Sequence, residues 1–307
     1  MLSATPPLVI GGHIADSCAM IGTLLSFGHG YSAQALARRL IARGWRVYGT
    51  TRDAGKAAAL ARAGVIPLLW DEGDFTPAFD AATHLLSSVA PDDAGDPVLA
   101  RFGTRIAGIA PRLAWAGYLS TTGVYGDHAG GWVNEDTPPA PTTGRGRQRV
   151  AAEVAWRAIP GLPLHIFRLA GIYGPGRGPF AKVRRGTARR IVKPGQVFSR
   201  IHVDDIARVL DASVARPDPG VIYNVCDDEP AAPQDVIAHA ARLLGVPLPA
   251  EVPFDEADLS PMARSFYAES KRVSNRRILD ELGVELAYPD FRAGLRALLD
   301  AETGAAL

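Results

Sequence analysis

Residues 20–33 of the chain read MIGTLLSFGHGYSA, an apolar run that leads directly into a glycine-rich turn. The run Ile21–Phe27 predicts a buried first strand, and the next six residues fit the pattern G-x-G-x-x-A that opens a helix. In this pattern the first glycine permits a tight turn, the second lets a diphosphate approach the backbone, and the alanine allows close helix packing. A turn without a ligand is the alternative, because glycine is common in turns. The flanking elements favour a dinucleotide site lined by Gly28, His29, Gly30, Tyr31, Ser32 and Ala33.

The residues after this turn alternate between helical and strand patterns. Apolar residues recur at helical spacing from Ala33 to Ile41, and Trp45–Thr51 predicts a second strand. Most of the strand runs are continuously apolar, which is typical of strands buried on both faces of a parallel sheet. The pattern therefore predicts an α/β fold with a doubly wound parallel Rossmann sheet. The further strands are predicted at Val65–Trp70, His84–Ala90, Gly117–Thr121, Leu164–Leu169 and Val221–Val225.

The spacing of these patterns loosens after about residue 170. Gly174–Gly178 and Pro247–Pro261 are rich in glycine or proline, while Asp235–Gly245 repeats a helical pattern. We interpret this part as a smaller C-terminal substrate lobe at the carboxyl edge of the sheet, where such sheets bind ligands. The expected division is an N-terminal extension outside the fold at 1–19, an NAD(P)-binding Rossmann domain at 20–170 and 200–226, and the substrate lobe at 171–199 and 227–307.

The composition excludes several classes of protein. Of the 307 residues, 47% are hydrophobic and 21% are charged, and the formal net charge is +1. A balanced charge gives no electrostatic reason to expect a nucleic-acid or membrane partner. Cys18 and Cys226 alone predict neither a disulfide framework nor a metal site, so we expect a cytoplasmic protein without a metal. The expected partner is a small-molecule substrate, with a homodimer left open.

The end of the second predicted strand bears on the choice of cofactor. NAD sites usually place an acid there for the ribose hydroxyls, whereas this chain has Thr50-Thr51-Arg52. An arginine can pair with the 2′-phosphate of NADP, so we predict NADP, with NAD the less favoured cofactor. The neighbouring Asp53 speaks against this preference, and a solvated Arg52 at a strand end is the alternative.

Four later segments add a resemblance to a family. They are Ser120–Gly126 (STTGVYG), Arg168–Gly176 (RLAGIYGPG), Arg200–Asp205 (RIHVDD) and Tyr223–Pro230 (YNVCDDEP). With the glycine turn, the chain resembles the short-chain dehydrogenase/reductase superfamily in its NAD-dependent epimerase/dehydratase branch, from about Met20 to the C-terminus. The segments Lys271–Asn275 and Tyr288–Leu295 are similar to an atypical subgroup of that branch. Further cofactor positions are then expected at Ser88, Val89, Ala90, Thr121, Arg149, Ala170 and Ile172.

The resemblance implies a catalytic hydroxyl, a tyrosine and a lysine four residues after the tyrosine. Thr121 occupies the hydroxyl position, but anchoring on Glu153 places Arg145 and Arg149 where the tyrosine and lysine belong. Arginine stays protonated in proteins, so it cannot serve as the acid or base, although Arg149 can hold a ribose or a phosphate. The pattern Y-x-x-x-K does occur at Tyr267–Lys271, but outside the expected context, and we interpret it as a chance match.

Other residues are candidates for proton transfer or anion binding. Asp96 is predicted either to move a proton or to cap a helix, with equal weight. His128 is more simply a solvated loop residue, and Tyr125 and Tyr173 are packing residues. We expect Asp204 and Asp205 to cap a helix and His202 to pack structurally. An anion-binding rim is a further possibility for Arg145, Arg147 and Arg149.

Together these features predict an NAD(P)-binding oxidoreductase or epimerase-like enzyme for a small hydroxylated or carbonyl compound, including a nucleotide-linked sugar. In that reading Thr121 orients the substrate oxygen, and Asp96 or water handles the proton. The alternative is a catalytically degenerate NADP-binding sensor or regulatory protein, because Arg145 and Arg149 stand where proton chemistry belongs. A lyase or isomerase that uses a tightly held cofactor is a third, weaker interpretation.

Overall fold

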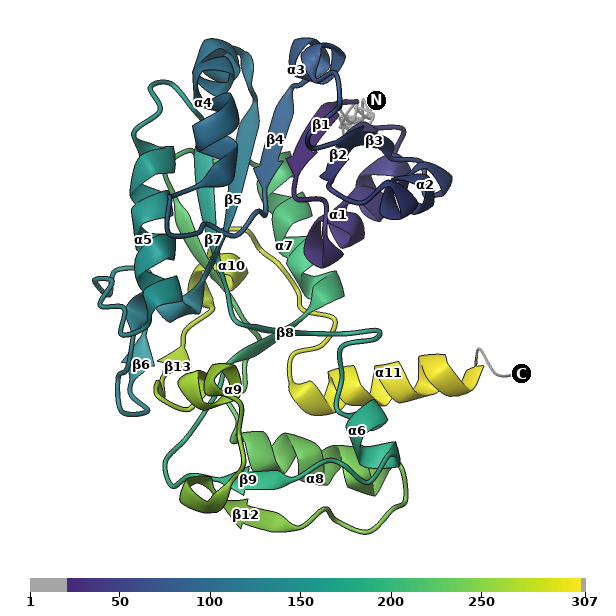
Figure 1. Cartoon of the computed structure of the whole chain (residues 1–307), viewed down its shortest axis with the longest axis vertical. Coiled ribbons are helices and arrows are strands. Elements are labelled where there is room, and N and C mark those ends of the chain that lie inside the picture. The colour runs from purple at the N-terminus through teal and green to yellow at the C-terminus, as the bar shows by residue number, and fades with distance from the viewer. Residues whose placement is uncertain (1–20, 305–307) are drawn as a thin grey trace, which may run out of the picture.

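A seven-stranded parallel sheet forms the centre of the computed structural model, which describes residues 21–304 (Figure 1). The predicted extension at 1–19 lies outside the described residues. The strand order is β11-β7-β5-β4-β1-β2-β3, so the order reverses between β1 and β4. All seven predicted strands are confirmed, with ends shifted by at most a few residues. The bounds are β1 Thr23–Phe27, β2 Arg46–Thr51, β3 Ile66–Leu69, β4 His84–Ser87, β5 Trp115–Thr121, β7 Leu164–Leu169 and β11 Ile222–Val225.

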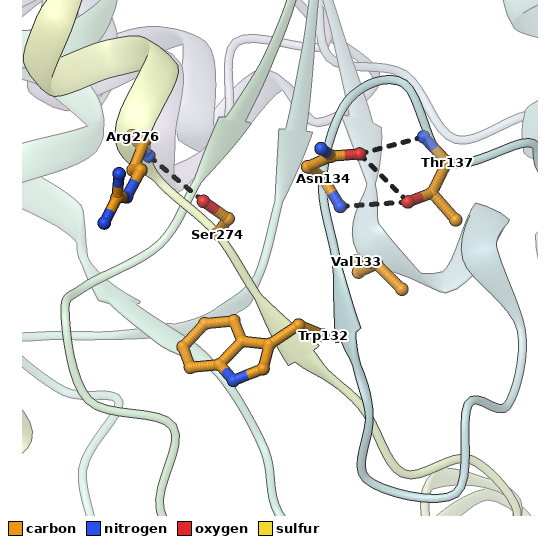
Figure 2. A pocket seen from close by; sticks show the side chains of 6 residues that line it. All are labelled: Trp132, Val133, Asn134, Thr137, Ser274 and Arg276. Carbon is orange, nitrogen blue, oxygen red and sulfur yellow. Dashed lines mark hydrogen bonds between the residues drawn. The ribbon is translucent and has the colours of Figure 1, made fainter.

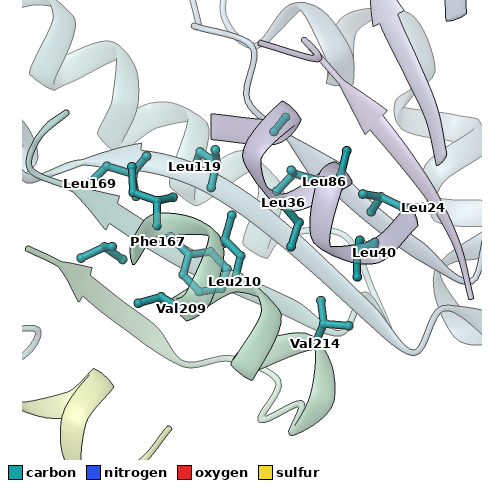
Figure 3. Packing of buried hydrophobic residues seen from close by; sticks show 14 of the residues in the cluster. Leu24, Leu36, Leu40, Leu86, Leu119, Phe167, Leu169, Val209, Leu210 and Val214 are labelled. Atoms are coloured by element: carbon teal, nitrogen blue, oxygen red, sulfur yellow. The ribbon is translucent and has the colours of Figure 1, made fainter. Parts of the chain in front are cut away.

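Helices cover both faces of this sheet, which confirms the doubly wound α/β fold. One face carries α1 (Tyr31–Ile41), α2 (Ala54–Arg62) and α7 (Val203–Ala215), and its core is shown in Figure 3. The other face carries α3 (Thr76–Ala81), α4 (Pro97–Ile109) and α5 (Gly144–Arg157). Apart from the edge strand β3, the strands are largely buried on both sides, as their continuous apolar runs predict.

A second group of elements lies beyond the carboxyl ends of the strands (Figure 1). Three two-stranded parallel sheets pair β10 with β8, β12 with β9 and β13 with β6. Within residues 21–304, no helix is both long and apolar enough to span a bilayer. The strands are β6 Trp132–Val133, β8 Gly171–Tyr173, β9 Arg190–Val192, β10 Arg200–His202, β12 Glu251–Pro253 and β13 Arg272–Val273. The helices of this group are α6 Phe180–Arg184, α8 Pro233–Leu243, α9 Pro261–Phe266 and α11 Phe291–Gly304, and α10 Arg276–Asp280 contacts β11. The 3₁₀ turns are η1 Ala110–Arg112 between α4 and β5, η2 Thr122–Tyr125 after β5, and η3 Phe254–Glu256 after β12.

Two local expectations differ from the structure. Asp204 and Asp205 do not cap α7, because the cap is the His202 side chain, whose Nδ1 accepts the Asp204 N–H at 3.2 Å. Buried Asp205 instead accepts the backbone N–H groups of residues 287 and 288 at 2.8 and 3.0 Å. In addition, Ile278 and its neighbours, expected in the smaller lobe, pack into the core of the main sheet.

Candidate functional site

The glycine turn connects β1 to α1 at the carboxyl edge of the sheet, next to the point where the strand order reverses. Gly28 has φ +67°, a conformation that favours glycine, and a Cβ there would lie 2.8 Å from Val89 Cγ2. The Gly28 N–H donates to Thr50 Oγ1 at 2.7 Å, and the His29 N–H donates to Thr50 O at 3.0 Å. The Ser88 hydroxyl donates to Gly28 O. The ends of β2 and β4 therefore hold the turn in place.

The first turn of α1 has the features of an anion site. Its N-cap is Gly30, and in the described structure no side chain accepts its first amides and no acid lies in its first turn. By contrast, Asp53, Asp96 and Thr143 cap α2, α4 and α5 with side-chain oxygens. A Cβ on Gly30 would meet only Gly28 O, at 3.4 Å. Open amides, together with the helix dipole, suit a diphosphate at this end of α1.

His29 supports the turn from inside the protein. Its ring is fully buried, its Nδ1 lies 2.9 Å from Ser26 Oγ, and its Cγ would lie 2.7 Å from a Cβ on Gly49. Burial, together with a smaller effect of the nearby Lys56, lowers the pKa of His29 to about 4. The imidazole is therefore neutral at physiological pH, and its role is to pack between the turn and β2.

The end of β2 presents positive charge. The Arg52 side chain is exposed and has no hydrogen-bond or ion-pair partner among the described residues. The carboxylate of Asp53 accepts the Lys56 N–H at 3.1 Å and thereby caps α2. Asp53 is thus used as a helix cap, while Arg52 and Lys56 leave two cations near the turn.

Tyr31 joins the turn to the segment that follows β8. Its hydroxyl donates to Pro175 O at 2.9 Å, and the Arg177 guanidinium lies 4.5 Å from the ring centroid. Ile172 and Tyr31 both pack against a small cluster of buried residues from α1 and α7. Ala170, at the end of β7, belongs to a different cluster around Tyr125. Of the predicted cofactor residues, Ile172 therefore lies beside the turn, and Ala170 lies further along the sheet edge.

Arg145 and Arg149 both lie on α5, one helical turn apart. Arg149 Nη1 donates to Leu119 O at 2.7 Å and to the Tyr118 hydroxyl at 3.1 Å, so it joins α5 to β5. Burial raises the pKa of Tyr118 to about 12, so this phenol stays protonated. Arg145 is exposed, and its guanidinium lies 5.9 Å from the ring centroid of Phe266 on α9.

Thr121 and Asp96 have clear local partners. Thr121 Oγ1 accepts the Gly123 N–H at 3.1 Å and caps η2, which leaves the hydroxyl proton free to donate. Asp96 is buried; its Oδ1 accepts two amides at the start of α4, at 2.8 and 3.1 Å, and its Oδ2 accepts Trp156 Nε1–H at 2.8 Å. This geometry agrees with the helix-cap alternative for Asp96.

A buried ion pair supports the edge of the sheet next to Thr121. Arg168 donates to both carboxylate oxygens of Glu153, at 3.1 and 2.9 Å, and to the Tyr125 hydroxyl at 3.0 Å. The Tyr125 hydroxyl donates to Asn224 Oδ1 at 2.7 Å. Tyr125 is fully buried, which agrees with its expected packing role. This network, which the sequence did not reveal, fixes β5, β7, β11 and α5 relative to one another.

Tyr267 and Lys271 do not form a catalytic pair on one helix. Tyr267 is the C-cap of α9, and Lys271 lies beyond it, immediately before β13. Lys271 Nζ donates to Gly126 O at 2.6 Å and to Glu269 Oε2 at 2.7 Å. The interpretation of this pattern as a chance match therefore agrees with the local geometry.

A cavity of about 410 Å³ lies apart from these residues, where β6 and β13 meet the start of α10 (Figure 2). Exposed Trp132 and Arg276 line it, together with Asn134 and Ser274. None of the predicted site residues belongs to its lining. The candidate cofactor site is therefore identified by the open backbone amides of the glycine turn and not by this cavity.

Comparisons with known proteins place this geometry in context. Residues 113–226 match the model of the family described as the NAD dependent epimerase/dehydratase family. Protein YeeZ of Escherichia coli K12 is 31% identical over 275 residues, 86% of this chain and 95% of YeeZ. A 3-diazoavenalumate denitrifying reductase of a Streptomyces species is 29% identical over 200 residues, 61% of this chain and 63% of the reductase. A conserved protein of unknown function from Silicibacter pomeroyi has a solved structure with 63% identity and TM-score 0.89, covering 91% of this chain and 99% of its own.

Proposed function

The chain belongs to the NAD dependent epimerase/dehydratase family, which confirms the resemblance, and we propose that it is an NADP-binding oxidoreductase for a small hydroxylated or carbonyl compound. The observation that carries the proposal is the uncapped start of α1 at Gly28–Ala33. Its amides would hold the cofactor diphosphate, and the bound cofactor would supply hydride chemistry. The Streptomyces relative is named as a reductase, which supports this class of reaction.

The preference for NADP over NAD rests on the charges at the end of β2. Arg52 is exposed without an acidic partner in the described part of the chain, and Lys56 lies near the turn. A 2′-phosphate adds negative charge that both cations favour. Asp53, the acid that would favour a ribose hydroxyl, already accepts a backbone amide.

The proposed chemistry assigns binding and orientation to this chain's residues. Thr121 uses one lone pair for the Gly123 N–H and still has its proton for a substrate oxygen. Arg149 cannot exchange a proton at neutral pH, and its Nη1 is held by Leu119 O. The proton of the reaction therefore comes from water in this proposal. The exposed Arg145 guanidinium suits an anionic substrate, and a nucleotide-linked sugar lies within that class.

The replaced residues on α5 favour a second candidate function. The helix Gly144–Arg157 contains no tyrosine and no lysine, so it offers neither residue of the family's proton-transfer pair. A protein that binds NADP without turning over a substrate would act as a sensor or regulatory partner. This candidate predicts the same cofactor affinity as the oxidoreductase and no hydride transfer.

One experiment separates the two functions. The purified chain is titrated with NADPH and NADH by calorimetry, and then mixed with NADPH and a panel of aldehydes, ketones and keto sugars while the cofactor absorbance is followed. We expect tighter binding of NADPH than of NADH, and cofactor oxidation with at least one carbonyl compound. Binding without oxidation across the panel would support the sensor. Absence of binding to either nucleotide would overturn both candidates.

A further inference from the structure

A second cavity lies in the smaller lobe, between the segment after β8, the strand β10 and the helices α8 and α11. Its volume is about 250 Å³. Tyr173, Phe291 and Leu295 form an apolar wall of well-buried side chains, and Val236 of α8 adds a partly buried one. Two arginines, Arg177 and Arg200, also line the cavity. A guanidinium group beside an apolar wall is costly unless a partner satisfies its charge, so a ligand that supplies this partner would be favoured.

Arg200 is the inner cation of this cavity. Its Nη1 donates to Phe198 O at 2.9 Å and to Ala231 O at 3.0 Å, so two backbone carbonyls hold the guanidinium in position. Among the described residues, no carboxylate lies within ion-pair distance of it. A guanidinium has five N–H donors, so most of them remain for a ligand. Burial lowers the pKa of Arg200, which shows that its charge is poorly solvated.

Asp227 is the acid that acts most strongly on Arg200, but it does not neutralise the cavity. The residue is 1% exposed, and among the described residues its carboxylate makes no ion pair with Arg200 or with another cation. Burial raises the pKa of Asp227 to about 8, so the carboxyl group is mostly protonated at neutral pH. Because no carboxylate of the described residues forms an ion pair with Arg200, its positive charge is available to a ligand.

Arg177 stands at the mouth of the cavity. The side chain is exposed, and its guanidinium stacks 4.5 Å from the centroid of Tyr31 without an acidic partner in residues 21–304. Its position is fixed on the other side by the contact between Tyr31 and Pro175 O. A ligand that enters the cavity would therefore pass one cation before it reaches the second.

We propose that this cavity is a binding site for a small carboxylate with an apolar ring, separate from the cofactor turn. Arg200 would bind the carboxylate in the bidentate geometry that guanidinium groups favour, and the ring would contact Phe291 and Leu295. A volume of about 250 Å³ suits a single ring rather than a nucleotide. The inference goes beyond the proposed function, because the wall and the inner cation lie outside the glycine turn and α5.

The test is calorimetry on the full chain with benzoate and with benzyl alcohol, which has a similar shape without the charge. We expect one benzoate site, with affinity at least about tenfold higher than for benzyl alcohol, because hydrogen bonds to a charged group are the stronger ones. Arg200→Met should remove this preference. The matched control Arg242→Met, an exposed arginine on α8 outside the lining, should keep it.

A second variant guards against a folding defect in Arg200→Met. Val236→Phe fills the cavity from α8 and should weaken benzoate binding about tenfold or more while the chain keeps its melting temperature. The proposal is overturned if benzoate does not bind, if benzyl alcohol binds as well as benzoate, or if a folded Val236→Phe binds benzoate like the unchanged chain. NADPH titration of the same samples reports the cofactor site independently, so the two proposals fail separately.

Discussion

The glycine turn after β1 and the start of α5 lie at the same edge of the sheet, but they present opposite chemistry. The turn offers backbone amides that no side chain accepts in the described structure. At the start of α5, the Thr143 side chain accepts the Gly146 N–H, and the guanidinium groups of Arg145 and Arg149 follow on the helix. One edge of the sheet therefore combines a helix start with open backbone amides, which suit an anion, and a helix start whose amide is already capped.

The strongest test of this comparison is Gly30→Asp in the turn. A carboxylate at the start of α1 would satisfy the open amides and repel the diphosphate, so we expect NADPH affinity to fall at least about a hundredfold. A Cβ has room here, with Gly28 O at 3.4 Å, so the chain should still fold. Calorimetric titration with NADPH measures the effect.

Gly108→Asp is the matched control, because Gly108 is an exposed position on α4 with open space for a Cβ. This variant adds the same charge away from the turn and should bind NADPH like the unchanged chain. If Gly30→Asp also binds normally, the turn is not the diphosphate site, and the contrast with α5 loses its basis.

Burial of His29 gives the stability of the chain a pH dependence that originates in the turn. Its pKa in the folded chain is about 4, whereas an unfolded histidine titrates near pH ~6.5. Unfolding therefore takes up a proton in mild acid, so the stability present above pH ~6.5 is lost as the pH falls towards about 4. Between about pH 7 and pH 5 we expect a loss of about 2 kcal/mol from this residue. Urea unfolding of His29→Asn at both pH values should show a correspondingly smaller loss.

His84→Asn provides the control for this measurement. His84 is also buried, with a pKa lowered to about 4, but it lies at the opposite end of its strand from the cofactor edge. Its replacement should flatten the pH dependence in the same way and leave NADPH binding intact. Identical pH profiles for His29→Asn and the unchanged chain would show that the imidazole in the turn is not held neutral.

Arg52→Ser tests whether the cation at the end of β2 selects NADPH over NADH. Removing one cation that faces the 2′-phosphate should weaken NADPH binding about tenfold and leave NADH binding unchanged, because only NADPH carries that phosphate. Competitive titration of the two nucleotides measures the ratio. Arg62→Ser, at an exposed position in the last turn of α2, is the control. Equal losses for both nucleotides would mean that Arg52 acts on general charge and does not select NADP.

The sequence predicts those elements whose local residue pattern matches their burial and backbone conformation in the folded chain. The apolar runs of the inner strands of the main sheet are buried on both faces, so their composition alone reveals them. The Gly28–Ala33 turn can also be recognised from the sequence, because the positive φ and close neighbours of Gly28 require a glycine at that position. The cap of α7 was predicted wrongly, because the acids at 204 and 205 look like caps although the acceptor is His202.

The remaining features depend on partners far away in the chain. Tyr31 meets Pro175 across 144 residues, and no local pattern signals that contact. The sequence shows an arginine at position 149, but it does not show which group that arginine contacts. Its acceptor, Leu119 O, lies nearby only because α5 packs on β5. The sequence could not decide whether Asp96 transfers a proton or caps a helix. Its Oδ2 accepts a hydrogen bond from the indole of Trp156, which lies 60 residues away on α5. Long-range packing, rather than residue type, determines what these groups can do.

Asp96→Asn tests an acid that contacts α5 through the Trp156 indole. Asparagine can keep its oxygen on the amides of α4, but its NH₂ group then faces the Trp156 N–H, which loses its acceptor. We expect a loss of about 1 kcal/mol in the free energy of unfolding, and an unchanged rate of NADPH oxidation with any carbonyl compound that the unchanged chain reduces. Denaturant unfolding and steady-state kinetics measure the two effects. A large fall in rate with little loss of stability would return Asp96 to proton transfer, and α5 and its surroundings would then hold an acid that replaces the missing tyrosine.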